Sequence, residues 1–132
     1  MSKTFELLRQ AGTFFVSTVN GDVPATRPFG AVMEYDGEIY FSTAVGKDVY
    51  SQLKLNPAVQ IVAMTGESRQ WLRVNGKAAE VFDLQVKQAM LDACPNLIRH
   101  FEKAGCESFA LFKVAERESI LFDNSGKTKL ED

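Results

Sequence analysis

Two glycine-containing dipeptides, Asn20-Gly21 and Asp36-Gly37, interrupt runs of alternating apolar and polar residues near the start of the chain. Asn-Gly and Asp-Gly are strong signals for two-residue hairpin turns, because both central residues of a type I′ turn need positive φ. They separate three predicted strands, at residues 13–19, 23–35 and 38–43. Strands joined by tight hairpins run antiparallel, so the sequence predicts an antiparallel sheet.

The rest of the chain adds three predicted strands and a few short helices. Apolar spacing and end signals predict helices at residues 5–11, 47–55 and 83–94 and a short one ending near 103, with strands at 58–64, 71–82 and 109–122. This order predicts one mainly β (α+β) domain over residues 1–132, a small closed antiparallel barrel of six strands. Pro24 and Pro28 cannot donate to a ladder, so an edge or a bulge is expected there. A small barrel fills its own interior, so a ligand is expected outside it or at a seam.

Composition argues against several classes of function. The chain has 132 residues, 45% of them hydrophobic and 24% charged, which is typical of a single packed domain. Its net charge is −2 and its basic residues are scattered, so a nucleic-acid partner is not expected. No apolar run approaches the ~20 residues of a membrane helix, and the N-terminus has no signal-peptide core. A cytoplasmic location without membrane contact is therefore expected.

Metal chemistry is not expected either. Cys94 and Cys106 are too few for a disulfide scaffold or a four-ligand zinc site, and both are expected to be reduced packing residues. His100 is the single histidine and lies in a predicted helix among apolar residues. This setting favours a structural or surface role for His100 over a catalytic or haem-ligating one.

Candidate binding residues gather where the third predicted strand meets the helix that follows it. Ser42 and Thr43 end the strand, and Lys47 stands at the start of the helix. A helix N-terminus offers unpaired N–H groups and a partial positive charge, so these residues suit a phosphate. A solvated polar turn is the alternative. Asp48 is discordant with an anion site and is expected to point away and cap the helix.

A second cation, Arg27, lies in the predicted strand 23–35. A hairpin joins this strand to the one that carries Ser42, so direct antiparallel pairing is expected to bring the two residues close together. Arg27 and Lys47 would then form a paired anion clamp, whereas the alternative for Arg27 is an ordinary surface cation. Phe29 offers either an aromatic face to a ligand or a plug for the core.

Three longer stretches resemble a known family. They are RPFGAVMEYDGEIYFSTAVGKDVYSQLKLNPAVQI, WLRVNGKAAEV and, more loosely, FKVAERESILFDNSG. From about Phe14 to Gly126, the order of elements is similar to that of the pyridoxamine 5′-phosphate oxidase-like flavin-binding split barrels. The resemblance implies a six-stranded antiparallel split β-barrel with short bridging helices. It also implies a homodimer that holds FMN at its interface.

The resemblance also implies which residues surround the flavin. Arg27 takes the place of an arginine beside the flavin, and Lys47 matches a phosphate-binding lysine. The two residues after the arginine would run along the isoalloxazine ring. Tyr50 and Gln52, in the first turns of the following helix, are expected to approach the cofactor. The full set of implied cofactor-binding residues is Arg27, Pro28, Phe29, Ser42, Thr43, Lys47 and Trp71.

Three departures from the family's pattern concern the substrate and the flavin ring. Val32 stands where the vitamin-making oxidases have a substrate lysine, and Asp123 replaces a tryptophan in their C-terminal motif. Trp71 stands where the family usually has a flavin-contacting glutamine, and an indole cannot copy both roles of an amide. The comparison with the family's pattern therefore predicts that the flavin-binding residues are retained and that the substrate-binding residues are lost.

The resulting hypothesis is an FMN-dependent oxidoreductase that acts on an unidentified small molecule and is not a true pyridoxamine 5′-phosphate oxidase. No catalytic residue is identified, because a flavin supplies the redox chemistry itself. Nitroimidazole reductases are among the family's relatives, but no residue selects a nitro compound or a quinone as substrate. Two alternatives stay open: a flavin-binding or sensing protein without turnover and, with less support, a haem-binding protein.

Overall fold

The chain folds around one antiparallel sheet, which the computed structural model describes for residues 1–67 and 69–132. The elements are α1 (Lys3–Ala11), β1 (Phe14–Asn20), β2 (Val23–Phe29), β3 (Met33–Tyr35), β4 (Glu38–Ala44), α2 (Asp48–Leu55), β5 (Ala58–Met64), β6 (Trp71–Val81), α3 (Leu84–Ala93), the 3₁₀ turn η1 (Pro95–Leu97), α4 (Ile98–Phe101), β7 (Phe109–Asp123) and β8 (Gly126–Leu130). The predicted mainly β class is confirmed. No helix in the described ranges is long and apolar enough to cross a membrane.

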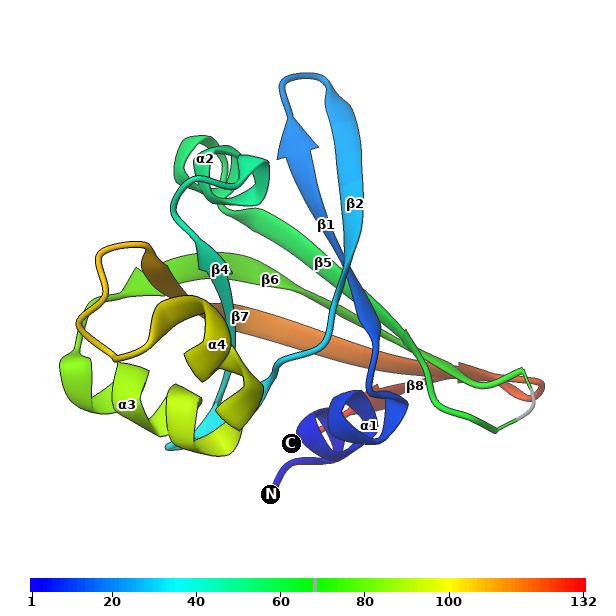
Figure 1. Ribbon diagram of the computed structural model, residues 1–132. Helices are drawn as coiled ribbons and strands as arrows, with labels where there is room; N and C mark the ends of the chain where they lie inside the picture. The colour runs from blue at the N-terminus through cyan, green and yellow to red at the C-terminus, as the bar shows by residue number, and fades with distance from the viewer. Residues whose placement is uncertain (68) are drawn as a thin grey trace.

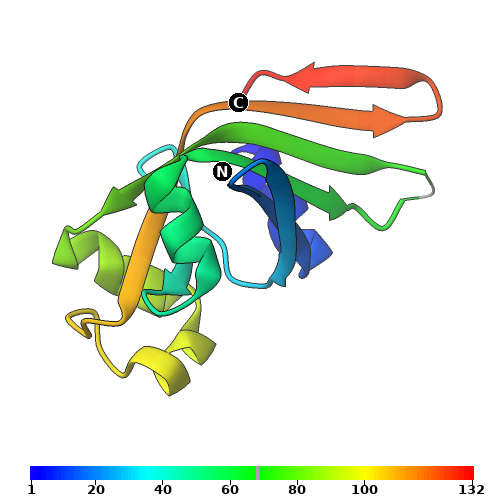
Figure 2. The ribbon, with the colours of Figure 1, turned by 90° about the horizontal axis from the view of Figure 1, so that it is seen from above.

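The sheet has the order β2-β1-β5-β6-β7-β4-β3, and β8 pairs with the last part of β7. Its strands curl around a common interior, as Figures 1 and 2 show from two directions. The two edge strands, β2 and β3, are consecutive in the chain and joined only by residues 30–32. Among the described residues no ladder joins these edges, so the barrel is split and not closed.

The sheet has eight strands instead of six for two reasons. The predicted strand 23–35 breaks into β2 and β3, because the chain leaves one edge of the sheet after Phe29 and joins the other edge at Met33. The polar segment GKTKL forms β8, a strand that its composition did not predict. Pro24 and Pro28 lie on the edge strand β2, as predicted.

The two predicted hairpins are present, one of them shifted by a residue. Asp36 and Gly37 both have positive φ, 53° and 80°, as a type I′ turn requires. In the first hairpin Asn20 still pairs with Val23, so the two loop residues are 21 and 22 instead of 20 and 21. The antiparallel pairing inferred from both dipeptides is confirmed, and only the register of the first hairpin differs.

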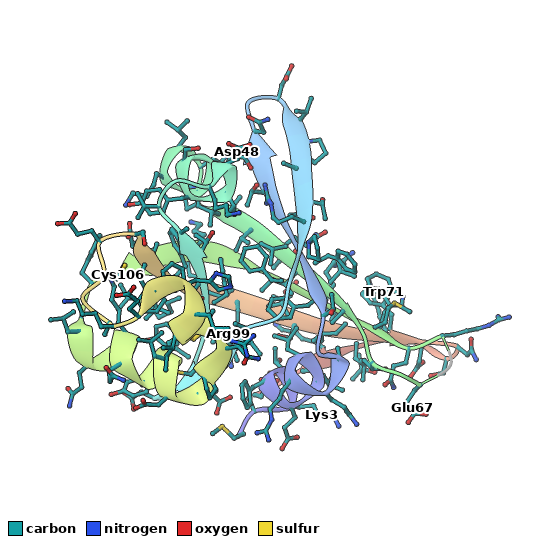
Figure 3. All side chains as sticks on the ribbon, viewed as in Figure 1. Lys3, Asp48, Glu67, Trp71, Arg99 and Cys106 are labelled. Carbon is teal, nitrogen blue, oxygen red and sulfur yellow. The ribbon has the colours of Figure 1, made fainter. Side chains whose placement is uncertain are left out.

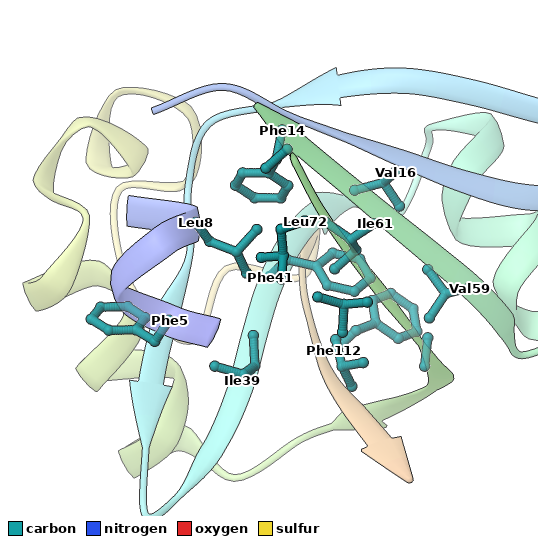
Figure 4. Packing of buried hydrophobic residues seen from close by; sticks show 14 of the residues in the cluster. Phe5, Leu8, Phe14, Val16, Ile39, Phe41, Val59, Ile61, Leu72 and Phe112 are labelled. Carbon is teal, nitrogen blue, oxygen red and sulfur yellow. The ribbon is translucent and has the colours of Figure 1, made fainter. Parts of the chain in front are cut away.

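Apolar side chains fill the interior of the barrel (Figure 4). Phe14, Phe41 and Phe112 have 0%, 0% and 1% exposure, and the rings of Phe41 and Phe112 stack at 5.7 Å. Helix α1 closes one end by inserting Phe5 and Leu8 into this cluster. The interior is therefore packed, and a ligand site lies outside it.

A second apolar cluster joins the sheet to the helical layer of α3 and α4. Val86 and Met90 of α3 and Phe101 of α4 pack in this cluster with buried residues of β4 and β7. Asp83 is the N-cap residue of α3, as the sequence predicted, and its side chain accepts a hydrogen bond from the Gln85 amide at 2.8 Å. The helical layer is thus fixed against the sheet, and it supplies one wall of the site described below.

Gly76 lies at a bulge in β6, where the register against β7 shifts. A Cβ at this position would lie 2.7 Å from Val114 Cγ1 and 2.8 Å from the Ala115 carbonyl oxygen. We expect Gly76→Ala to lower the free energy of unfolding by about 2 kcal/mol, because the backbone atom cannot move aside easily. Urea unfolding measures this loss. Gly105→Ala is the control, since a Cβ there meets nothing within 4 Å. An unchanged midpoint for Gly76→Ala would contradict the tight packing.

Candidate functional site

A pocket of about 1610 Å³ lies outside the packed barrel. Its walls come from α1, from β2 and the segment after it, from the end of β4 with the start of α2, and from the turn between α3 and α4. Figure 1 shows how these elements are arranged, with α2 near the top of the view and α1 near the bottom. The predicted cofactor-binding residues that line the pocket are Arg27, Pro28, Phe29, Ser42, Thr43 and Lys47.

Arg27 is held in place by acceptors of its own chain. Nη1 donates to Thr18 Oγ1 at 2.8 Å and to the carbonyl oxygens of Val16 and Ala25, both at 3.2 Å. Nη2 donates to Gln52 Oε1 at 2.7 Å. An arginine fixed by this many contacts loses little conformational freedom when it binds a ligand. Arg27 is therefore a pre-positioned cation at the pocket wall.

Arg27 and Ser42 do not become neighbours by strand pairing. Arg27 pairs with Val16 of β1, whereas Ser42 pairs with Leu111 of β7. Both residues still line the same pocket, because the curled sheet brings its two ends together. The predicted pairing is wrong, although both residues line the same pocket.

The end of β4 and the start of α2 supply the remaining polar groups of this wall. Ser42 and Thr43 are buried in the fold, with 9% and 8% exposure, and still contribute to the pocket surface. Lys47 is exposed and is the N-cap residue of α2, with no side-chain cap hydrogen bond. Together with Arg27 they give this wall two cations and two hydroxyls. We call these four residues the cradle; donors of this kind suit a phosphate.

The position of Asp48 differs from the one predicted from the sequence. It is the first residue of α2 and does not cap the helix, because Lys47 occupies the N-cap position. It lines the pocket, beside α2 and the first hairpin in Figure 3. Burial lowers the pKa of Arg27, and the negative charge of Asp48 opposes that shift. The expectation that Asp48 points away is wrong, and the cradle has a carboxylate beside it.

The residues expected along the flavin ring divide between core and pocket. Phe29 plugs the core, because its half-buried ring packs edge-on against Phe41 at 5.6 Å. Pro28 is exposed and lines the pocket. Of the two helix residues expected near the cofactor, Gln52 lines the pocket and Tyr50 does not. The apolar residues that line the pocket next to Arg27 are therefore Pro28 and the half-buried Phe29.

Thr18 is a site residue that the sequence analysis missed. It has 3% exposure and lies on β1 in hydrogen-bond contact with both Arg27 and Gln52. Its signal in the sequence is its position, since it continues the inward-facing row of Phe14 and Val16. A buried hydroxyl in such a row needs a polar partner, and here that partner belongs to the pocket wall.

The wall opposite the cradle includes Cys94 and His100. The Cys94 thiol donates to the Val32 carbonyl oxygen at 3.5 Å, and burial raises the pKa of this thiol. Cys94 and Cys106 are both free and half-buried against the second cluster, as predicted. His100 is exposed on the pocket wall, and its ring meets the edge of Phe101 at 6.3 Å.

Trp71 lies away from this pocket, on the outer face of the sheet (Figure 3). The Trp71 ring stacks on the Phe122 ring at 4.1 Å, and the Arg73 guanidinium lies 4.9 Å from the centre of the Phe122 ring. The Arg73 Nε is buried and has no hydrogen-bond partner among the described residues. The outer-face patch around Arg73 consists of Phe15, Val62, Met64, Trp71, Ile120 and Phe122.

Comparison with known proteins places the chain in a family. The family model described as pyridoxamine 5′-phosphate oxidase matches residues 2–124. A solved structure of a NimC/NimA family protein from Clostridium acetobutylicum is 31% identical, with a TM-score of 0.90, 97% of this chain covered and 91% of that chain. No match was found among curated protein sequences.

Two more distant structures share the fold. General Stress Protein 26 from Bacillus anthracis is 17% identical with a TM-score of 0.74, covering 95% of this chain and 94% of that one. A pyridoxamine 5′-phosphate oxidase-related, FMN binding protein from Nostoc punctiforme is 14% identical with a TM-score of 0.71, covering 95% and 82%. The match over residues 2–124 shows more than a shared fold: the chain belongs to the pyridoxamine 5′-phosphate oxidase-like family of split-barrel proteins.

Proposed function

We propose that the chain binds FMN through the cradle and works as a flavin-dependent oxidoreductase on a small molecule. The observation that carries this proposal is the convergence of Arg27, Ser42, Thr43 and Lys47 on one pocket wall from separate elements. Family membership and the FMN binding named for the Nostoc punctiforme relative support a flavin over other phosphorylated ligands.

The residues present fit a flavin phosphate in charge and in space. The cradle has two cations and two hydroxyls, and the N-terminus of α2 adds unsatisfied N–H groups and the positive end of the helix dipole. The pocket volume of about 1610 Å³ exceeds the 300–1,000 Å³ typical of a single ligand site. The pocket is therefore large enough for a flavin.

Bound FMN supplies the electron transfer, and the chain supplies position and shielding. Arg27, held by Thr18 and Gln52, fixes where the phosphate sits. Pro28 gives the ring an apolar flank next to it. The turn between α3 and α4 lines the same pocket and would shield the bound ring from water on that side.

The proposal includes a homodimer with two equivalent FMN sites at its interface. A flat ring system must be shielded on much of its surface, and one chain offers the cradle and one flank. The outer-face patch supports a second copy of this chain as the missing wall. Phe15 and Met64 are 43% and 59% exposed there, and an exposed apolar patch of this kind is typical of a contact surface between chains. Trp71 is the patch residue we propose to lie nearest the partner's flavin.

Spectra and titrations of the purified protein test this function. We expect flavin absorbance bands, and tighter binding of FMN than of riboflavin because the cradle recognises a phosphate. NADH- or NADPH-driven reduction of a quinone or a nitro compound then separates an oxidoreductase from a flavin-binding protein without turnover. Equal affinities for FMN and riboflavin would contradict the cradle, and a Soret band would indicate haem instead.

Asp48→Asn is expected to tighten FMN binding about twofold to fivefold. The carboxylate lies beside Arg27 at an exposed position and repels the phosphate, and exposed charge pairs contribute about 0.5–1 kcal/mol. Fluorescence titration of the apoprotein at low salt measures the gain. Riboflavin affinity is the control, since it has no phosphate to repel and should not change. Weaker FMN binding by Asp48→Asn would mean that the carboxylate supports the cradle.

Little or no pyridoxamine 5′-phosphate oxidase activity is expected, even with FMN bound. Val32 lines the pocket where, by the family resemblance, the substrate lysine would stand. Asp123 is the last residue of β7, where its carboxylate accepts two hydrogen bonds from Ser125. The substrate's phosphate would lack its cations, and an unpaired buried dianion is costly. Formation of pyridoxal 5′-phosphate at micromolar substrate measures this, and robust formation would contradict it.

A further inference from the structure

The orientation of the Gln52 side-chain amide follows from its two neighbours. Gln52 Oε1 accepts hydrogen bonds from Arg27 Nη2 at 2.7 Å and from Thr18 Oγ1. Arginine has no acceptor, so the oxygen of the amide must face it and the nitrogen must lie on the other side. Gln52 lines the pocket, and within the described residues no hydrogen bond engages its Nε2 donors. Two N–H groups are thus available to a ligand.

The Arg27 guanidinium has donors left as well. Of its five N–H groups, the two on Nη1 are shared among Thr18, Val16 and Ala25, and one on Nη2 goes to Gln52. In the described part of the chain, the Nε donor and the second Nη2 donor have no partner. The buried Thr18 hydroxyl closes the network, because it accepts from Arg27 and donates to Gln52.

We propose that Gln52 is a phosphate-binding residue with two roles. Its Oε1 fixes the guanidinium of Arg27, and its Nε2 donates to the same anionic group that Arg27 binds. The ligand class is a phosphate monoester, and here the inference rests on the proposed function. The cradle then has an amide donor whose direction is set by Thr18 and Arg27 rather than by the ligand.

Gln52→Glu separates the two roles. Glutamate keeps an oxygen that accepts from Arg27 and Thr18, but it replaces both N–H donors with a second oxygen. We expect FMN affinity to fall about tenfold or more, with riboflavin affinity changed by less than about twofold. Gln88→Glu is the matched control, because Gln88 is exposed on α3 and donates to Asp92 at 3.0 Å, outside the pocket lining.

Repeating the titration at about 1 M salt screens the added charge, whereas loss of a donor persists. A Gln52→Glu protein with wild-type FMN affinity at both salt concentrations would overturn the inference. An affinity loss that disappears completely at high salt would also overturn it, because repulsion alone would then explain the loss.

A second measurement needs neither flavin nor turnover. Inorganic phosphate is titrated into the apoprotein while NMR follows the Gln52 side-chain amide and the Arg27 Nε–H signals. Saturable shifts of both signals support the inference, even if the wild type fails to bind FMN and the proposed function falls. FMN binding with an unmoved Gln52 amide, with phosphate or FMN present, would overturn the inference and leave the function standing.

Discussion

Arg27→Ala is expected to weaken FMN binding by at least a hundredfold. A hydrogen bond to a charged group contributes about 1.5–3 kcal/mol, and the two open donors of Arg27 allow two such bonds to a phosphate, hence about 3 kcal/mol or more. The loss is larger than for Lys47→Ala, expected at about tenfold, because Lys47 is exposed and offers a single flexible contact. Fluorescence titration with FMN measures both.

The controls separate loss of the phosphate contact from loss of the fold. Riboflavin affinity should change little in Arg27→Ala, since riboflavin has no phosphate. Arg99→Ala is the matched arginine control, because Arg99 is exposed on α4 and is not part of the pocket lining (Figure 3). Arg27→Met keeps most of the aliphatic stem and should lose the same affinity as Arg27→Ala. Equal losses for FMN and riboflavin would contradict phosphate recognition by Arg27.

The fold was largely predictable because local signals coincide with its elements. The Asp36-Gly37 turn, the N-cap at Asp83 and the stop at Gly12, which has φ 78°, all lie where the sequence predicted them. The break between β2 and β3 was not predictable, because the run 23–35 has no turn signal strong enough to show that it changes edges. β8 was missed because GKTKL is polar and has no alternating apolar pattern that would predict its pairing with the end of β7.

Residue types at the site were predictable, but the contacts among them were not. Arg27 and Lys47 were singled out by charge next to a glycine and hydroxyls, and both line the pocket. Their positions relative to β4 depend on the curvature of the whole sheet, which no local sequence pattern predicts. The direction of Asp48 and the contact of Thr18 with Gln52 depend on tertiary geometry in the same way.

The second large expected effect concerns the outer-face patch, and the change that tests it is Met64→Asp. Met64 is 59% exposed and pairs across the strands with Trp71, so a carboxylate there is tolerated in a single chain. In a two-fold dimer built on this face, the new charge is buried twice, once from each copy. Each unpaired buried carboxylate costs several kcal/mol unless it is neutralised.

Met64→Asp is therefore expected to raise the dimer dissociation constant at least a hundredfold, equivalent to about 3 kcal/mol, and to weaken FMN binding as the dimer dissociates. Sedimentation over a wide concentration range, with and without FMN, measures both effects on the same sample. Leu55→Asp is the matched control, since Leu55 is 89% exposed at the end of α2 and lies outside the patch. Loss of the dimer and loss of FMN are expected to occur together, because a flavin enclosed by two copies of the chain cannot stay tightly bound to one copy. A wild-type or Met64→Asp monomer that holds FMN stoichiometrically would contradict both the dimer and the shared site.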